Sequence, residues 1–218
     1  MSDTADGGSA EAAADAITVY SDYVCPFCYL GRESLSRYQE SREEPLQVDW
    51  HPFDLRAQQR GPDGEIDHSV DTGKDEAYFE QARANVERLQ ERYGVEMALD
   101  LATDVDSLNA QVASFHVRQT HDYDRWLALD EAILAALWEA GRDIGDPDVL
   151  TDLAADAGID PEEVRAAVED EEARRAVTER FEAARRQRIT GVPTFAYGDH
   201  VARGAVPPEQ LRRLVEGV

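Results

Sequence analysis

The sequence predicts an α/β fold in which two β-containing segments flank a long helical block. Alternating, strand-like runs stand near both ends of the chain, whereas residues 75–188 show helical periodicity throughout. A Cys-x-x-Cys motif follows the first strand-like run directly. We therefore expect a βαβ half, a helical insertion and a ββα half, with the two halves forming one sheet that the insertion caps.

The first half begins with the β-rich run Ile17-Thr18-Val19-Tyr20, followed by the cysteine motif and a helix over residues 32–40. A second alternating run covers residues 46–53. A strand, a helix and a strand within this length predict a parallel pair with a right-handed crossover. We expect residues 17–57 and 189–218 to form one α/β domain, residues 58–188 a helical insertion domain, and residues 1–16 a disordered acidic tail.

The insertion should start with a turn-rich loop over residues 58–73. Helical spacing then predicts helices that begin near Asp75, Leu108 and Tyr123. Asp146-Pro147 and Asp160-Pro161 are helix-start signals, and Glu163 stands in capping-box spacing from Asp160. The helix over residues 162–169 is expected to run on into residues 173–187. After the block, residues 191–197 and 200–203 predict a hairpin, and residues 207–216 a closing helix.

Cys25 and Cys28 are the only two cysteines, and a Cys-x-x-Cys between a strand and a helix is typical of a thioredoxin-like redox site. We expect Cys25 to lie exposed at the helix N-terminus, where unpaired N–H groups favour the reactive thiolate. Cys28, one turn later and partly covered, would resolve a mixed disulfide on Cys25. Pro26 suits the first helical position. Asp22 is a candidate proton shuttle for Cys28, or a cap of the loop.

Three other interpretations of the two cysteines compete with a redox site. A zinc site needs about four ligands, and the sequence offers no second cysteine pair. His116 and His121 are five residues apart and should not share a helix face. A structural disulfide across two residues would close almost no loop, and two buried inert thiols are the third possibility. The redox site is favoured over all three, and we expect no metal and no cofactor.

The composition is strongly acidic, with 46 Asp and Glu residues against 22 Lys and Arg, a formal net charge of −24 and Lys74 as the only lysine. This balance argues against nucleic acid or anionic membrane as a partner. Molar salt screens the mutual repulsion of the acidic side chains, so the acidic composition suggests a salt-accumulating, halophilic host. The N-terminus lacks a basic region and an apolar core of a secretion signal, and no apolar run could span a membrane. We expect a cytoplasmic protein.

A wider set of residues resembles the DsbA-like thioredoxin superfamily, and within it the FrnE-like branch of dithiol oxidoreductases. The residues that carry the resemblance are Asp22, the run Cys25-Pro26-Phe27-Cys28-Tyr29-Leu30-Gly31, then Trp50, Pro52, Phe53, Leu55, Asp143, Ile144, Asp146, Val149 and Leu150, and finally the run Gly191-Val192-Pro193-Thr194-Phe195. The resemblance implies a cis bond at Val192–Pro193. It also implies a substrate groove formed by Pro26, Phe27, Val192 and Pro193.

The resemblance implies a thiol–disulfide oxidoreductase, with Cys25 as the nucleophile and Cys28 as the resolving thiol, acting on disulfides of proteins or small thiols. A recycling reductant or oxidant would be its partner, and the chain could be a monomer or a homodimer. Phe27 stands where DsbA has a histidine, which predicts a weaker oxidant. Asn109 fits the FrnE-like pattern, but Ser114 stands where a histidine is expected.

Two alternatives stay open at this point. The same superfamily contains 2-hydroxychromene-2-carboxylate isomerases and kappa-class glutathione transferases, which use a serine-type site with a thiol cofactor. A redox-sensing chaperone module is the other alternative. The presence of both Cys25 and Cys28 argues against the isomerase.

Overall fold

The computed structural model describes residues 15–61, 64–98 and 104–217. One mixed sheet has the strand order β2-β1-β3-β4. Its strands are β1 (Ala16–Ser21), β2 (Gln47–Pro52), β3 (Thr194–Tyr197) and β4 (His200–Arg203). β1 pairs parallel with β2 and antiparallel with β3, and β3 pairs antiparallel with β4. The first and last parts of the chain thus build one sheet around β1, as the sequence predicts.

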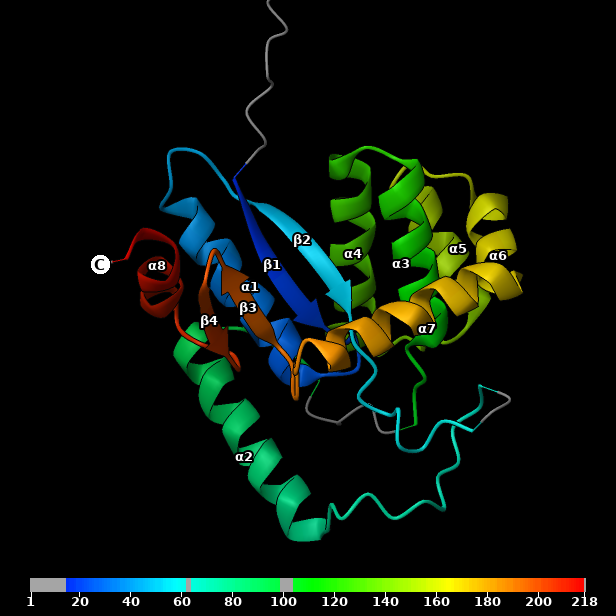
Figure 1. Cartoon of the computed structure of the whole chain (residues 1–218), viewed down its shortest axis with the longest axis horizontal. Coiled ribbons are helices and arrows are strands. Elements are labelled where there is room, and N and C mark those ends of the chain that lie inside the picture. The colour runs from blue at the N-terminus through cyan, green and yellow to red at the C-terminus, as the bar shows by residue number, and fades with distance from the viewer. Residues whose placement is uncertain (1–14, 62–63, 99–103, 218) are drawn as a thin grey trace, which may run out of the picture.

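Helices α1 (Pro26–Glu40) and α8 (Pro208–Glu216) come from the two halves and contact each other. The insertion supplies α2 (Glu76–Tyr93), α3 (Leu108–Thr120), α4 (Tyr123–Trp138), α5 (Pro147–Asp156), α6 (Pro161–Glu169) and α7 (Glu171–Arg186). In Figure 1, α3 to α7 gather beside β2, while α2 lies apart from them on the α1 and α8 side. The fold is an α/β thioredoxin-like fold with a helical insertion between β2 and β3.

Two expectations for the insertion are wrong in detail. Residues 162–187 do not form one helix, because Asp170 adopts an extended backbone and its carboxylate accepts hydrogen bonds from the Glu172 and Ala173 N–H groups, starting α7 anew. Glu163 does not close a capping box on Asp160. Its carboxylate contacts instead His116 of α3 and His121, the C-cap residue of that helix.

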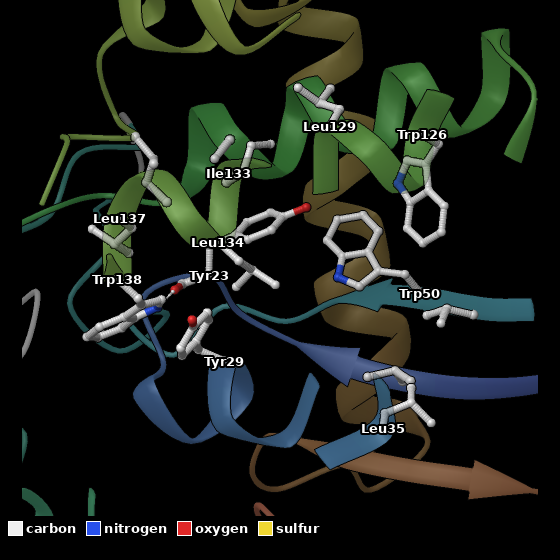
Figure 2. Close-up of a cluster of buried hydrophobic side chains, with 14 of the residues drawn as sticks. Tyr23, Tyr29, Leu35, Trp50, Trp126, Leu129, Ile133, Leu134, Leu137 and Trp138 are labelled. Atoms are coloured by element: carbon white, nitrogen blue, oxygen red, sulfur yellow. Dashed lines mark hydrogen bonds between the residues drawn. The ribbon is translucent and has the colours of Figure 1, made fainter. Parts of the chain in front are cut away.

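The main hydrophobic cluster contains residues of both the sheet and the insertion. Val19, opposite Trp50 and Phe195 in the sheet register, is fully buried. Figure 2 shows Trp50 of β2 facing the side chains of α4, among them Trp126 and Trp138. This shared core fixes the insertion against the sheet. The division into a domain of residues 17–57 and 189–218 and a second of residues 58–188 stays a prediction, and residues 1–14 of the predicted tail lie outside the described residues.

None of the helices in the described part of the chain has the length and apolar composition needed to cross a bilayer.

Candidate active site

The cysteine motif begins α1. Cys25 is the N-cap residue with an extended backbone, and Pro26 occupies the first turn, where its missing N–H costs no hydrogen bond. The Cys28 N–H donates to the Cys25 carbonyl at 2.9 Å, which closes the first turn and brings the second cysteine under the first. Both cysteines are free thiols. The predicted position of the dithiol at the start of the first helix is therefore confirmed.

The loop before β3 covers the dithiol. The Cys25 Sγ lies 3.6 Å from the Val192 carbonyl oxygen, and the Val192–Pro193 bond is cis, as the resemblance implies. Gly31, one turn beyond Cys28, lets this loop come close, because a Cβ at Gly31 would lie 3.0 Å from Pro193 Cγ and 3.1 Å from Phe195 Cζ. The last part of the chain is thus held against the first helix at the thiols.

The expected exposure of Cys25 is wrong. Cys25 is only 4% exposed and Cys28 is fully buried, because the loop that contains Val192 lies over the N-terminus of α1. Burial raises the pKa of the Cys28 thiol well above its usual range, and the neighbouring sulfur of Cys25 raises it further. Cys28 is therefore held as a neutral thiol while it stays buried, and it becomes a nucleophile only after losing its proton to another group.

Pro26 and Phe27 are half-buried, in contrast to the two cysteines that they separate. The Phe27 ring packs against the cluster of Leu30 with Val86, Leu89 and Tyr93 of α2. Val192 is also half-buried, whereas Pro193 is buried. These four residues surround the thiols, and their predicted role in substrate binding stays a prediction.

Asp22 is the buried carboxylate of the loop that precedes Cys25, and its hydrogen-bond donors come from the start of α3 and from the segment after β2. It accepts hydrogen bonds from Ser107 Oγ at 2.5 Å, Gln111 Nε2 at 3.3 Å and the Leu55 N–H at 2.9 Å. Burial raises the pKa of Asp22 to about 6, although the bonds from Ser107 and Leu55 oppose the rise. Asp22 caps its own loop through the Val24 N–H at 3.3 Å, and its role as a proton shuttle stays a prediction.

Tyr23 ties the same loop to α4. Its hydroxyl donates to Asp130 Oδ1 at 2.7 Å, and its carbonyl accepts from Trp138 Nε1 at 2.8 Å. Figure 2 shows the Trp138 indole directed at the Tyr23 backbone. Arg32 of α1 neutralises the buried Asp130, with Nη2 2.8 Å from Oδ2. The helical insertion therefore positions the cysteine loop from two sides, at Asp22 through α3 and at Tyr23 through α4.

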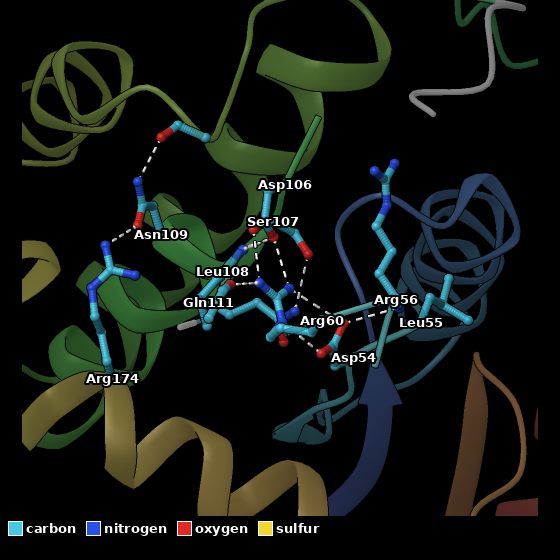
Figure 3. Close-up of polar contacts among 12 residues, drawn as sticks. Asp54, Leu55, Arg56, Arg60, Asp106, Ser107, Leu108, Asn109, Gln111 and Arg174 are labelled. Carbon is cyan, nitrogen blue, oxygen red and sulfur yellow. Dashed lines mark hydrogen bonds and ion pairs between the residues drawn. The ribbon is translucent and has the colours of Figure 1, made fainter. Parts of the chain in front are cut away.

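Arg60 joins the loop after β2 to the start of α3, as Figure 3 shows. Its Nη1 and Nη2 lie 2.8 and 2.9 Å from the two carboxylate oxygens of Asp106, and its Nε lies 2.9 Å from Asp54 Oδ2. A bidentate guanidinium–carboxylate pair fixes orientation as well as distance. This clamp holds Ser107, the residue after Asp106, in place against Asp22.

His116 of α3 and His121, the residue after α3, do not share a helix face, but both contact the carboxylate of Glu163. His116 Nε2 lies 2.8 Å from Glu163 Oε1, and His121 Nε2 lies 3.1 Å from the same oxygen. They converge because His121 is the C-cap residue with an extended backbone and has already left the helical geometry. Across the described ranges, no group of three or more His, Cys, Asp or Glu side chains is arranged to hold a metal ion.

Sequence reasoning missed Ser107 and Gln111. Gln111 is fully buried on the apolar face of α3 between Leu108 and Val112, and a polar residue at such a position was the available signal. Asn109, which the resemblance singles out, serves the packing of the insertion: it donates to the Gly145 carbonyl at 2.6 Å and accepts from Arg174 (Figure 3). Ser114 accepts a hydrogen bond from Trp126 Nε1 at 3.0 Å.

Comparisons with known proteins agree with this geometry. The chain is 28% identical over 203 residues to YwbO, an uncharacterized protein of Bacillus subtilis strain 168, covering 91% of this chain and 94% of that protein. Among solved structures, a probable DsbA oxidoreductase of Streptomyces coelicolor superposes with a TM-score of 0.74 at 22% identity, covering 93% of this chain and 88% of the other. These structural likenesses concern the fold alone.

Two further solved structures share the fold of this chain. A 2-hydroxychromene-2-carboxylate isomerase gives a TM-score of 0.70 at 18% identity, covering 91% of this chain and 92% of the other. The cytosolic disulfide reductase DsbM of Pseudomonas aeruginosa, solved with GSH, gives a TM-score of 0.60 at 20% identity, covering 91% of this chain and 92% of the other. The DSBA-like thioredoxin domain matches residues 16–216, from β1 to the end of α8. With its buried Cys25–Cys28 dithiol and the cis Val192–Pro193 loop above it, this chain belongs to the DSBA-like thioredoxin domain family.

Proposed function

We propose that this protein is a thiol–disulfide oxidoreductase in which Cys25 attacks and Cys28 resolves. The observation that carries the proposal is the position of Cys25, at the N-terminus of α1 and 3.6 Å from the Val192 carbonyl oxygen. Reactive cysteines are found at helix N-termini. In the reducing direction, the Cys25 thiolate attacks a substrate disulfide, a mixed disulfide forms and the first substrate thiolate leaves. The Cys28 thiolate then attacks the Cys25 sulfur and releases the second.

Cys28 needs a proton acceptor before it can attack, because burial keeps it protonated. Asp22 is the candidate that the chain offers in the same loop. Burial raises the pKa of Asp22 to about 6, so its carboxylate can both accept and release a proton near neutral pH. We propose that Asp22 takes up this proton by way of a rearranged loop or a water molecule, and that Pro26, Phe27, Val192 and Pro193 form the walls that orient the substrate.

We infer that the protein runs in the reducing or repairing direction in the cytoplasm. Phe27 between the cysteines can neither donate a hydrogen bond nor carry a charge to stabilise the thiolate. A less stabilised dithiol is a better reductant, and a Cys-x-x-Cys in the cytosol is more often catalytic than structural. A dithiol reductant would regenerate Cys25 and Cys28. The likeness to the isomerase is one of fold alone.

Two finer inferences accompany this function. We propose that the chain falls in the FrnE-like branch, which the run from Cys25 to Gly31 and Asn109 support and Ser114 does not. We also propose a salt-rich working environment, supported by the net charge of −24 and the single lysine.

The test of the oxidoreductase function is insulin reduction with dithiothreitol as the recycling reductant, using the wild-type chain and the Cys25→Ser and Cys28→Ser variants. Wild type should accelerate the reaction, Cys25→Ser should abolish the acceleration, and Cys28→Ser should stall at a mixed disulfide with insulin. Wild-type activity in Cys25→Ser would remove the proposed mechanism. The two variants serve as controls for one another, since each replaces one buried sulfur by oxygen.

A further inference from the structure

A cavity of about 490 Å³ opens at the carboxyl end of β2. It is of the size that small-molecule sites usually have. Segments from three parts of the chain line it: the residues after β2, the end of the loop before α2, and the end of α7. The lining residues are Phe53, Asp54, Leu55, Ala57, Gln58, Gln59, Thr72, Lys74, Arg185 and Thr190.

The lining of the cavity is connected to the loop that carries Cys25. Leu55 lines the cavity, and its N–H donates to Asp22 at 2.9 Å in the loop that precedes Cys25. The side chains of Leu55 and Val192 pack against the same cluster, to which Phe53 belongs. The Val192 carbonyl oxygen is 3.6 Å from the Cys25 Sγ. Leu55 and Val192 therefore link the lining of this cavity to the Cys25 thiol.

The lining of the cavity carries two positively charged side chains, whereas the protein as a whole is strongly negative. Lys74, the only lysine of the chain, and Arg185 both line the cavity, and neither forms an ion pair with any residue in the described ranges. The one carboxylate of the lining, Asp54, is already taken up by Arg60 and by the Arg56 N–H. In a chain with a net charge of −24, two cations without an ion pair in the lining of one cavity make that cavity a favourable place for an anion.

We propose that this cavity binds the carboxylate-bearing arm of low-molecular-weight anionic disulfides, with Lys74 and Arg185 as the groups that select them. The inference rests on the proposed function and names its substrate class. Carboxylate recognition by an ammonium and a guanidinium follows from charge and hydrogen-bond geometry.

The reaction balances as two exchanges. The Cys25 thiolate forms a bond to one sulfur of the substrate RSSR and breaks the S–S bond, so that one RS⁻ leaves and takes a proton. The Cys28 thiolate then forms a bond to the Cys25 sulfur and expels the second RS⁻. The substrate is reduced to two RSH while the enzyme dithiol is oxidised to a disulfide, which a dithiol reductant reduces again.

The test compares three disulfides of similar size and different charge: the dianion dithiodipropionate, the neutral hydroxyethyl disulfide and the dication cystamine. The second-order rate of oxidation of the reduced protein is measured for each by stopped flow. KCl is kept at the lowest concentration at which near-ultraviolet circular dichroism shows the native fold, because salt screens the charges. Each rate is divided by that of free dithiothreitol with the same disulfide.

Wild type should prefer the dianion over the dication, against the sign of its own net charge. Lys74→Gln and Arg185→Gln should each lower this preference by about threefold, the size of one partly exposed ion pair, and Lys74→Glu should shift it further toward cystamine. Arg212→Gln, which removes an exposed arginine of α8, is the matched control and should leave the preference unchanged.

Different outcomes would contradict the anionic binding site and the proposed oxidoreductase function. Exchange that ignores substrate charge, or a preference that survives Lys74→Gln and Arg185→Gln together, overturns the anionic site while leaving the oxidoreductase intact. Turnover of insulin but of none of the three small disulfides also overturns it, in favour of protein substrates. If none of these disulfides and no insulin is reduced, the proposed function itself fails.

Discussion

The Cys25 Sγ and the Val192 carbonyl oxygen lie 3.6 Å apart, although 167 positions separate these residues in the sequence. The contact is possible because β1 and β3 are neighbours in the sheet, so that the loops at their ends meet. The helical insertion lies between them in the sequence and holds the cysteine loop through Asp22 and Tyr23. The site is therefore assembled from both ends of the chain and from the insertion.

Gly31→Ala should destabilise the protein by about 1–3 kcal/mol, which is the usual cost of overpacking a filled core. A methyl group at this position would meet Pro193 Cγ at 3.0 Å and Phe195 Cζ at 3.1 Å, and both are buried residues. Urea unfolding measures the change. Because the clash pushes the Val192 loop away from α1, the variant should also react faster with a thiol-alkylating reagent at Cys25.

The matched control is Gly191→Ala, two residues before Pro193, where an added Cβ meets nothing within 4 Å. Its stability should stay within about 0.5 kcal/mol of wild type. Equal effects of the two substitutions would show that the close approach of the loop to Gly31 does not hold the site together.

Asp22→Asn should remove a pH dependence of stability between about pH 4 and pH 6. Burial raises the pKa of Asp22 from 3.8 to about 6 in the folded chain, against the opposing bonds from Ser107 and the Leu55 N–H and with a further rise from Asp54. The folded state thus holds this proton more tightly than the unfolded state. The stabilisation is fully present below the unfolded pKa and is lost as the pH rises through the folded pKa, by up to about 3 kcal/mol.

Urea unfolding at several pH values tests this sign. Relative to wild type, Asp22→Asn should become steadily more stable as the pH rises from 4 to 6, whatever constant offset the altered hydrogen bonds bring. Asp199→Asn, at an exposed hairpin position, is the control and should run parallel to wild type. A constant difference between Asp22→Asn and wild type across this range would contradict a raised pKa at Asp22.

Arg188→Gly should stabilise the protein by about 1 kcal/mol. Arg188 has a φ of 62° at the end of α7, where the Ile189 N–H bonds to Ala184 and the Arg188 N–H to Arg185 in a Schellman motif. Gly158 occupies the same position after α5, with a φ of 71° and open space around it. Gly158→Ala is the reciprocal control and should cost about as much as Arg188→Gly gains. A loss of stability in Arg188→Gly would mean that the arginine side chain makes a compensating contact.

Salt should raise the melting temperature. Between about 0.1 M and about 1 M KCl the Debye length falls from about 10 Å to about 3 Å, which screens the mutual repulsion of 46 acidic residues. Replacing the exposed Glu43 and Glu44 by glutamine should lessen the dependence, since part of the repulsion is removed. A melting temperature that is flat or falls with KCl would rule out the proposed salt adaptation.

The fold was predictable from local patterns because its elements carry strong local signals. Alternation over β1 and β2, the Pro26 start of α1 and the Asp146 and Asp160 caps all act within a few residues. The division of residues 162–187 was missed because the Asp170 cap competes with a sequence that is helical on both sides.

The sequence predicts the two reacting cysteines of the site but not the residues that surround them. Cys25 and Cys28 stand out by composition alone, but the burial of Cys25 depends on a loop that is 167 positions away. Ser107 and Gln111 meet Asp22 only through the packing of α3 against the loop after β2. The shared contact of His116 and His121 with Glu163 depends on the backbone at the end of α3, which spacing rules for regular helices do not describe.

The most direct test of the account is intact-mass analysis after reaction with hydroxyethyl disulfide, whose neutrality makes it independent of the cavity. Cys28→Ser should carry one mixed disulfide, located on Cys25 by peptide mapping. Wild type should carry no adduct and should lose two hydrogens as the Cys25–Cys28 disulfide forms, and Cys25→Ser should react far more slowly than Cys28→Ser. An adduct that persists on wild type, or equal reaction of the two variants, would contradict a nucleophilic Cys25 resolved by Cys28.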